Sequence, residues 1–293
     1  MGTTSNASVR LAYISGGFPV WALFVAHTQG LFEQHGIQVD ITHTGASNSQ
    51  MQGLREGRFD VGLQLPDHVV RAGLHGSDLC VLAAQSHAPD VALVAAPDIQ
   101  AIAQLKGHRI AVDGARSGYA LLLVKLLTSL GWGPNDYQLV EVGDSQQRVN
   151  ALRSGELQAS FVNPPLDKAL VNDGFVRLTT TRQAFPSYPG PVVAARRAWA
   201  DANAGAAQGL QRAWLAAWQW LLHPEHQAQA IELAIQHLGA EAPAANLALQ
   251  NLQRQGVPSI SHDGMSQVID LVWQNEPVGQ TPQPDPAGYF WRA

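Results

Sequence analysis

Sixteen residues, spread over short polar stretches, have side chains or backbone that suit contact with a small anion. Glycines let consecutive backbone N–H groups turn toward an anion, while hydroxyls, amides and guanidinium groups complete its shell. Aromatic side chains can wall the apolar body of such a molecule. The candidate ligand contacts are Ser15, Gly16, Gly17, Phe18, Ser47, Asn48, Asp67, His68, Ser86, His87, Arg116, Ser117, Gly118, Tyr119, Asn163 and Tyr188.

Arg116 is the sharpest of these candidates because it lies between two glycines, Gly114 and Gly118, just before an apolar helical run. A guanidinium matches a carboxylate with two parallel hydrogen bonds, so Arg116→Ala is expected to weaken anion binding by about 30-fold or more. The alternative interpretation is a solvated surface arginine. Ser47 and Asn48 have a similar alternative, since both residue types commonly cap helices.

Catalysis is the competing chemistry. Asp67 beside His68 follows an apolar run, and such a pair could act as a general base or as a helix cap with a polar ligand contact. Cys80 lies inside an apolar run, which is typical of a buried, inert thiol. Ser15 has no evident base. The eleven histidines show no HxxxH or HExxH spacing, so we expect no metal site and no cofactor.

Composition excludes several classes of protein. The 293 residues carry 23 acidic against 18 basic side chains, a net charge of −5, which leaves no electrostatic footprint for nucleic acid. One cysteine excludes an intramolecular disulfide and a Cys-based zinc site. No signal peptide and no apolar run of about 18 residues is visible. We therefore expect either a cytoplasmic protein or the mature form of a periplasmic one.

An internal repeat of about 98 residues predicts how these residues are positioned. Residues 55–66, REGRFDVGLQLP, are echoed by residues 153–164, RSGELQASFVNP. Each copy alternates apolar strands with helices, a pattern typical of right-handed crossovers in parallel sheets. Because ligands bind beyond the carboxyl ends of parallel strands, the candidate contacts fall where each strand ends. The sequence thus predicts an α/β protein with two similar lobes.

Residues 1–88 are predicted to form the first part of lobe one, residues 89–186 lobe two, and residues 187–293 the return to lobe one. Two extended segments, at about residues 85–90 and 185–192, connect the lobes. They predict a hinge that closes on a ligand in the cleft between the lobes. One helix is expected over 19–34. After the second crossing the pattern is helical, and helices 204–222, 225–238, 242–255 and 263–275 are expected to cover lobe one. The Pro-rich tail from 277 is expected to be extended.

Several of these segments resemble one family. Residues 18–26, FPVWALFVA, and 30–39, GLFEQHGIQV, are similar to the opening of the sulfonate, nitrate, taurine and thiamin-pyrimidine-precursor binding proteins. Residues 105–112, LKGHRIAV, and 152–159, LRSGELQA, resemble later landmarks of that family. The resemblance implies the type II periplasmic-binding-protein fold, each lobe a mainly parallel sheet flanked by helices. It also implies solute capture for an ABC importer, with a permease and an ATPase as partners.

The sequence therefore favours a monomeric binding protein for a small carboxylate or sulfonate, with an aromatic or heterocyclic body as one option. Two alternatives stay open. One is a cytoplasmic enzyme on the same fold, a decarboxylase or lyase using His68 and Asp67, or a desulfinase-like protein. The other is a ligand-sensing protein. Fold alone does not decide among them.

Overall fold

The chain divides into two compact units in the computed structural model, which describes residues 6–14, 16–45, 47–88, 90–115, 117–143, 145–164, 166–279 and 281–292. Unit 1 comprises Met1–His87, Pro189–Ile269 and Val278–Ala293, and unit 2 comprises Ala88–Tyr188 and Asp270–Pro277. The segment 270–277 thus belongs to unit 2, although the sequence assigned everything after 187 to lobe one. Its Leu271 is buried in the apolar core of unit 2.

Unit 1 is built on a five-stranded sheet in the order β2-β1-β3-β10-β4. The strands are β1 (Ala7–Tyr13), β2 (Ile37–His43), β3 (Val61–Gln64), β4 (Leu79–Ala84) and β10 (Val192–Arg196). Strand β1 pairs in parallel with β2 and β3, whereas β10 runs antiparallel to β3 and β4. Because Val192 pairs with both Gln64 and Ala84, the start of β10 shares an edge with the carboxyl ends of β3 and β4.

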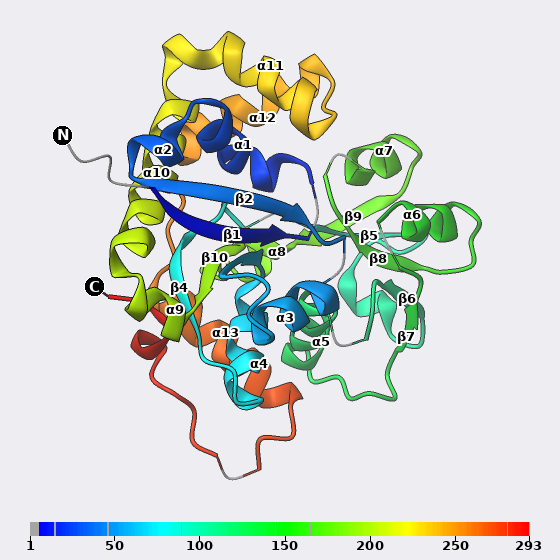
Figure 1. Cartoon of the computed structure of the whole chain (residues 1–293). Helices are drawn as coiled ribbons and strands as arrows, with labels where there is room; N and C mark the ends of the chain where they lie inside the picture. The colour runs from blue at the N-terminus through cyan, green and yellow to red at the C-terminus, as the bar shows by residue number, and fades with distance from the viewer. Residues whose placement is uncertain are drawn as a thin grey trace, which may run out of the picture. The chain divides into compact units, whose positions relative to one another are not determined.

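Helices cover both faces of this sheet. They are η1 (Phe18–Val20), α1 (Trp21–Thr28), α2 (Leu31–Gln34), α3 (Ser47–Arg55), α4 (Pro66–Leu74), α9 (Arg197–Ala202), α10 (Ala204–Leu222), η3 (Pro224–His226), α11 (Gln227–Leu238), α12 (Ala242–Gln255) and η4 (Pro286–Tyr289), with α13 (His262–Asn275) shared between the two units. Figure 1 shows α1 and α2 on one side of β1 and β2, with α3 and α4 on the other. The single helix expected over 19–34 is wrong, because Gly30 adopts a left-handed φ of 63° and interrupts it.

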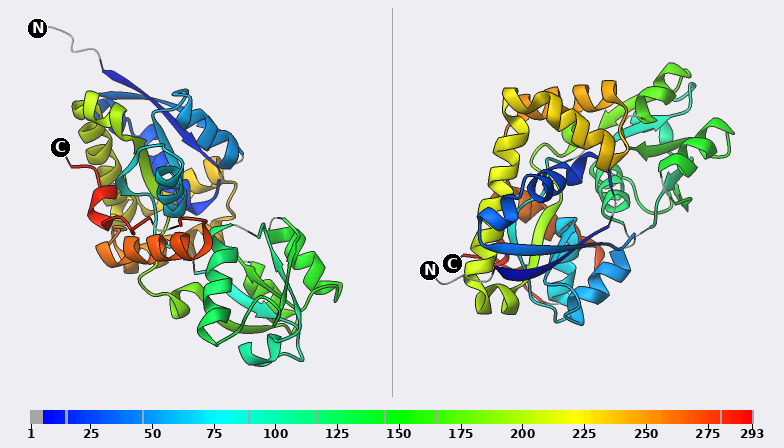
Figure 2. Two further views of the ribbon diagram at one scale, coloured as in Figure 1. Left: turned by 90° about the horizontal axis from the view of Figure 1, so that it is seen from below. Right: turned by 45° about the horizontal axis from the view of Figure 1, so that its top comes forward.

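Tryptophans on α1 and α10 form the centre of the unit 1 core, as the apolar stripe of residues 204–222 predicted. Trp214 and Trp218 are buried, and their indole N–H groups donate to the carbonyls of Ala84 (3.1 Å) and Gln85 (3.2 Å) at the end of β4. Trp21 donates to the Ala230 carbonyl on α11 at 3.1 Å. These three hydrogen bonds satisfy indole and carbonyl groups that burial would otherwise leave unpaired. The right-hand view of Figure 2 shows α11 and α12, yellow to orange, running side by side.

Unit 2 has the same strand plan. Its sheet has the order β7-β6-β8-β5-β9, with β6 parallel to β7 and β8, and β5 antiparallel to β8 and β9. The strands are β5 (Ala92–Ala95), β6 (Arg109–Val112), β7 (Gln138–Glu141), β8 (Ala159–Val162) and β9 (Val176–Thr180). The helices are η2 (Ile102–Leu105), α5 (Gly118–Ser129), α6 (Ser145–Arg153), α7 (Leu166–Asn172) and α8 (Thr181–Ala184).

The strand orders of the two sheets correspond position by position, as the repeat predicts. Strand β8 begins 98 residues after β3, and α6 begins 98 residues after α3. In each sheet the antiparallel strand comes from a segment that connects the units, β5 in unit 2 and β10 in unit 1. The α/β fold with two similar, mainly parallel sheets is confirmed.

The tail is anchored rather than simply extended. Trp291 is only 6% exposed in the unit 1 core, and its indole N–H donates to Asp201 Oδ1 at 2.9 Å. Phe290 forms an isolated β-bridge with Val81.

Across the described ranges, none of the helices combines the length and the apolar character needed to cross a bilayer.

Candidate functional site

The carboxyl edge of each sheet collects most of the candidate residues. In unit 1 the loop after β1 contains Gly17, whose φ of 87° is a conformation that favours glycine. Gly17 accepts a backbone hydrogen bond from Val20 and so starts η1. Phe18 is partly buried, with its ring centroid 5.4 Å from that of Trp21, and it packs on the core. Gly16 is exposed beside it.

The helix that follows β2 begins at Ser47, and Asn48 is exposed in its first turn. One turn on, Gln50 is completely buried, and its amide N–H donates to the carbonyls of Ala12 (2.9 Å) and Leu63 (3.1 Å). Gln50 therefore connects α3 by hydrogen bonds to the carboxyl ends of β1 and β3. The sequence did not single out Gln50, because the first four residues of α3 are all polar and no pattern marks this one as buried.

Asp67 and His68 occupy the first turn of α4 after β3. Asp67 is 0% exposed, and its Oδ2 forms an ion pair with Arg71 Nη1 at 2.9 Å, one helical turn away. His68 Nδ1 is buried, and within the described part of the chain it has no hydrogen-bond partner. The carboxylate thus holds Arg71, and the two neighbours do not form the Asp–His hydrogen bond of a general-base pair.

Ser86 and His87 follow β4, where the chain leaves unit 1. The Ser86 hydroxyl donates to the His87 carbonyl at 3.3 Å. His87 Nε2 donates to the Gly256 carbonyl at 2.8 Å, and its ring lies edge-on to Trp218, with centroids 6.1 Å apart. Both residues are therefore held by contacts within unit 1.

Unit 2 contains a small hollow of about 10 Å³ at the carboxyl edge of its own sheet, about the room that one water molecule needs. Its lining is Val91, Ala111, Val112, Asp113, Tyr119, Ala120, Arg148, Phe161 and Asn163. Two of the candidate residues, Tyr119 and Asn163, lie in this wall. Ser117 caps α5 by accepting from the Ala120 N–H at 3.1 Å, and its own hydroxyl donates to Asp113. Gly118 is buried as the first residue of α5.

Arg148 is a charged residue of the pocket wall that the sequence did not single out. It is only 7% exposed, and its guanidinium donates to the carbonyls of Phe161 (3.3 Å) and Gly143 and to Ser145 Oγ (3.0 Å). Ser145 Oγ also accepts from Asn163 Nδ2 at 3.0 Å. Arg148 and Asn163 thus belong to one hydrogen-bond network.

Three candidates remain. Tyr188 is half-buried against the unit 2 core, and its backbone N–H donates to Phe185. Ser15 and Arg116 lie outside the described residues, so their predicted contacts remain predictions.

In the part of the chain that the structure describes, no group of three His, Cys, Asp or Glu side chains could hold a metal ion. Cys80 is buried in β4, and its thiol donates to the Ala195 carbonyl at 3.6 Å. Burial raises the pKa of Cys80 to about 12, so the thiol stays protonated at neutral pH.

Comparisons with known proteins agree with this fold. The chain is 20% identical to the periplasmic aliphatic sulphonate binding protein SsuA from Escherichia coli, with a TM-score of 0.79 over 98% of both chains. It is 21% identical to the alkanesulfonate-binding protein SsuA from Xanthomonas axonopodis bound to MOPS, with a TM-score of 0.74 over 99% of both chains. A Candida albicans protein described as having the generic periplasmic binding protein fold gives a TM-score of 0.69 at 18% identity, over 96% of this chain and 93% of that one. These likenesses establish the periplasmic-binding-protein fold.

Curated relatives are found in Brucella. A protein of Brucella abortus named "Putative binding protein" is 26% identical over 193 residues, which are 64% of this chain and 59% of the relative. The match thus spans about three-fifths of the length of that relative. The NMT1-like family model matches residues 2–235. Since that match covers well over half of the sequence, the chain belongs to the NMT1-like family.

Proposed function

We propose that the protein is the substrate-binding component of an ABC-type importer and that it captures a small organic anion, a carboxylate or a sulfonate. The observation that carries this proposal is the unit 2 pocket, which lies where β6 and β8 end and has Arg148 in its wall. Ligands of open α/β sheets bind at this edge, and arginine is the side chain best suited to an oxyanion. The fold and the family support the same assignment.

The proposed contacts are the loops at the carboxyl edges of both sheets. They comprise Gly16, Gly17, Phe18, Ser47, Asn48, Asp67, His68, Ser86 and His87 in unit 1, and Ser117, Gly118, Tyr119, Asn163 and Tyr188 in unit 2, with Ser15 and Arg116 added on the sequence alone. Glycine backbone and hydroxyls would hold the anion, and the aromatic rings would pack on its apolar part. In this proposal no cofactor takes part.

The proposal extends to partners and place. Several solved structures of this fold are named as periplasmic or as components of ABC-type import systems. We therefore propose that the protein works as a monomer outside the cytoplasmic membrane and delivers its ligand to a permease driven by an ATPase.

Binding without turnover fits the described residues better than catalysis does. Asp67 is paired with Arg71, and the pKa of Cys80 lies far above neutrality. Neither group is thereby prepared as a base or a nucleophile. The proposed role is therefore capture and release.

A library of metabolites, screened by thermal shift and then by mass spectrometry of the incubated compounds, tests this proposal. We expect acids to raise the melting temperature and to be recovered unchanged. Conversion of a binding acid into product would establish an enzyme instead. A library in which no compound of any charge stabilises the protein would contradict a binding function altogether.

A further inference from the structure

Two glutamines of unit 1 are buried on the same face of its sheet. Gln64 is the last residue of β3 and is 3% exposed, and Gln50, in α3, is 0% exposed. A Cβ at Gly62 would lie 3.3 Å from Gln50 Cδ, so Gly62 faces α3. Because side chains alternate along a strand, Gln64 lies on that face as well. The two residues therefore share their type, their burial and their side of the sheet.

The fold uses only one of these two side chains. The Gln50 amide donates to the carbonyls of Ala12 and Leu63. Neither Nε2 nor Oε1 of Gln64 has a hydrogen-bond partner among the residues that the structure describes. A buried amide without partners gives up its hydrogen bonds to water and gains none in return. Gln64 therefore lowers the stability of the chain.

The second unit shows that the backbone plan does not require an amide at this position. The equivalent residue is Val162, the last residue of β8, which is 0% exposed and packs in an apolar cluster. Gln64 pairs with Val192 in β10, and Val162 pairs with Ala92 in β5, so both end a strand beside the segment that connects the units. An apolar side chain fits the same place, and the polarity of Gln64 calls for a reason beyond the fold.

Gln64 lies at the carboxyl edge of the unit 1 sheet, where ligands of open α/β sheets bind. Tyr13, at the end of the neighbouring β1, pairs with Leu63, so the loop after β1 begins beside Gln64. In that loop a Cβ at Gly16 would meet no atom within 4 Å, which shows open space at this part of the edge.

Other polar atoms at this edge are in the same condition. The side-chain oxygen of Gln50 and Nδ1 of His68 are buried, and within the described ranges neither has a hydrogen-bond partner. Three elements, α3, β3 and α4, thus bring unpaired polar atoms to the carboxyl edge of one sheet. Gln64 differs from the other two residues because both its donor and its acceptor are unpaired.

We infer that Gln64 is a specificity-determining residue through which unit 1 recognises a neutral group of the ligand that both donates and accepts hydrogen bonds, a hydroxyl or a primary amide. This inference rests on the proposed function and adds a second, neutral group to the acid that is captured. A carboxylate only accepts and a methyl group does neither, so only a group with both capacities satisfies both ends of the amide. A site with such a buried amide rejects an analogue that lacks the matching group, because the amide then stays unpaired.

The test uses the full chain and pairs of acids of nearly the same shape that differ in one polar group. The pairs are lactate with isobutyrate, isethionate with propanesulfonate, and succinamate with isocaproate, together with any hydroxylated or amide-bearing acid from the thermal-shift library and its deoxygenated analogue. Titration calorimetry measures each pair against wild type and Gln64→Met, which keeps the side-chain volume and removes the polarity. We expect wild type to bind the polar member of a pair about 10-fold more tightly or better, and Gln64→Met to bind both members within threefold of each other.

Melting curves of the protein without added acid separate this role from a structural one. Gln64→Met removes two unpaired groups and should raise the melting temperature by about 2 °C or more. Gln50→Met is the matched buried control, and it should lower the melting temperature because the carbonyls of Ala12 and Leu63 lose their donor. A Gln64→Met variant that melts below wild type would assign the amide a structural bond and overturn the inference.

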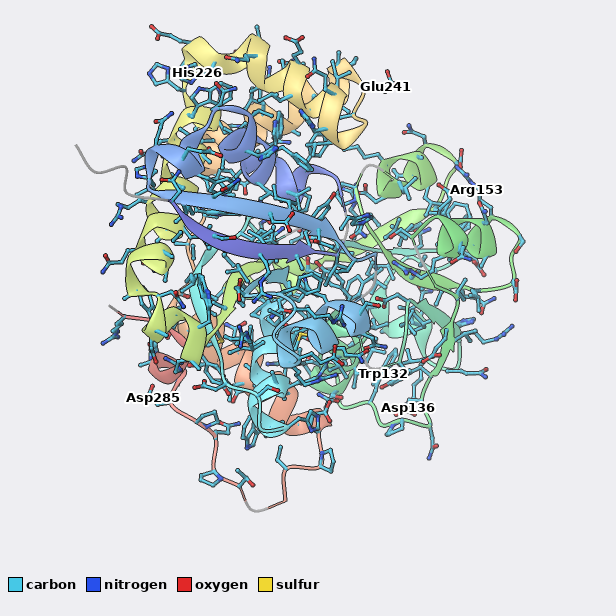
Figure 3. The ribbon with its side chains drawn as sticks, viewed as in Figure 1. Trp132, Asp136, Arg153, His226, Glu241 and Asp285 are labelled. Carbon is cyan, nitrogen blue, oxygen red and sulfur yellow. The ribbon has the colours of Figure 1, made fainter. Side chains whose placement is uncertain are left out.

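Gln236→Met is the exposed control. Gln236 donates to Glu232 Oε1 at 3.0 Å on α11, between His226 and Glu241, both of which Figure 3 labels. Its replacement should leave the preference between paired acids within threefold of that of wild type. A loss of preference in this variant equal to the loss in Gln64→Met would show that the effect does not belong to the buried amide, and it would overturn the inference.

Two binding results would also overturn the inference. The first is a Gln64→Met variant that keeps the wild-type preference for the polar member of each pair. The second is a wild-type protein that binds both members equally, which leaves the proposed function standing and removes only the role of Gln64. If wild type binds no acid at all, the inference and the proposed function fail together.

Discussion

Unit 1 and unit 2 place different polar groups on the same backbone plan. In each sheet, an arginine, Arg10 in β1 or Arg109 in β6, lies beside the residue that precedes the neighbouring strand β3 or β8. In unit 1 that residue is Asp60, which accepts from Arg10 Nη2 at 2.6 Å and from Arg196 Nη2 at 3.1 Å. In unit 2 it is Gln158, whose Oε1 accepts from the backbone N–H of Arg109 at 3.3 Å.

The backbone bonds between these pairs are nearly identical. The Asp60 N–H donates to the Arg10 carbonyl at 2.9 Å, and the Gln158 N–H donates to the Arg109 carbonyl at 3.0 Å.

Unit 1 thus buries Asp60 at the amino edge of its sheet, and unit 2 buries Arg148 at the carboxyl edge, where the pocket lies. Both units also bury a carboxylate near the start of the helix after β3 or β8, Asp67 in α4 and Asp167 in α7. Because Gln158 stands where unit 1 has Asp60, and Gln50 stands where unit 2 has Arg148, the shared backbone plan requires neither charge. In unit 1 the charge of Asp60 is paired with two arginines and contributes to stability.

The largest expected effect on stability comes from Asp60→Asn. Removing the carboxylate leaves two arginines without their shared acceptor charge, and we expect a loss of about 2–4 kcal/mol in the free energy of unfolding. The matched control is Asp78→Asn, since Asp78 pairs with Arg197 at 3.0 Å at an exposed position and should cost less than about 1 kcal/mol. Urea denaturation measures both. Equal losses in the two variants would show that burial of Asp60 adds nothing.

The pH dependence of stability sharpens the same contrast. Burial by itself raises the pKa of Asp60, but hydrogen bonds from Arg10 and Arg196 outweigh it and hold the pKa below its ordinary value of 3.8. The contribution of Asp60 is therefore complete above that ordinary value and is lost as the pH falls through the lower pKa of the folded state. The gap between wild type and Asp60→Asn should stay constant from pH 7 to about pH 5 and narrow below about pH 4. Urea denaturation at stepped pH measures the gap, and one that widens on acidification would contradict this assignment.

A smaller effect is expected at Gly62. In unit 1 Gln50 donates to two strand carbonyls, whereas in unit 2 the hydroxyl of Ser160 donates to the carbonyl of Ala111. Gly62 in β3 corresponds to Ser160 in β8, and a Cβ at Gly62 would lie 3.0 Å from Leu54 Cδ1 and 3.3 Å from Gln50 Cδ. Gly62→Ser should therefore displace Gln50 and cost about 1–2 kcal/mol, as overpacking does in other cores. Thermal and urea unfolding measure the loss. If the variant is as stable as wild type, a serine hydroxyl replaces Gln50 without strain in unit 1 as well.

The smallest effect is expected for Gln158→Asp, which gives unit 2 the carboxylate of unit 1. Arg109 is exposed, so the new pair should change stability by no more than about 0.5 kcal/mol. Urea unfolding measures the stability of this variant beside that of Asp60→Asn in unit 1. A gain as large as the loss in Asp60→Asn would mean that the amino edge of either unit can hold the buried charge.

The sequence predicted the scaffold better than the site because period and spacing act through the backbone. Helices 204–222 and 242–255 begin and end at the predicted residues, and the 98-residue repeat located β3 and β8. Gly30 broke an expected helix because its backbone conformation depends on local geometry that periodicity does not encode. Trp291 shows the limit at long range, since its contact with Asp201 crosses 90 residues.

The polar residues of the site were harder to predict for a related reason. Loops after strands were found from glycines and caps, which placed Tyr119 and Asn163 in the pocket wall. Gln50 and Arg148 lie inside helices, where polar side chains usually face water, and only the strand carbonyls beneath them explain their burial. Asp67 looked like a partner for His68 by adjacency, whereas helical spacing brings it to Arg71.

Hydrogen exchange with and without a bound acid tests most directly whether the carboxyl edges of the sheets form the ligand site. We expect ligand to slow exchange in residues 113–120, 143–149 and 161–164 of unit 2, and in residues 14–20, 45–50 and 64–68 of unit 1. Residues 55–60 and 153–158, at the opposite edges, serve as the internal control and should exchange at unchanged rates. Protection confined to those opposite edges, or absent from the unit 2 pocket under saturating acid, would contradict a ligand site at the carboxyl edges.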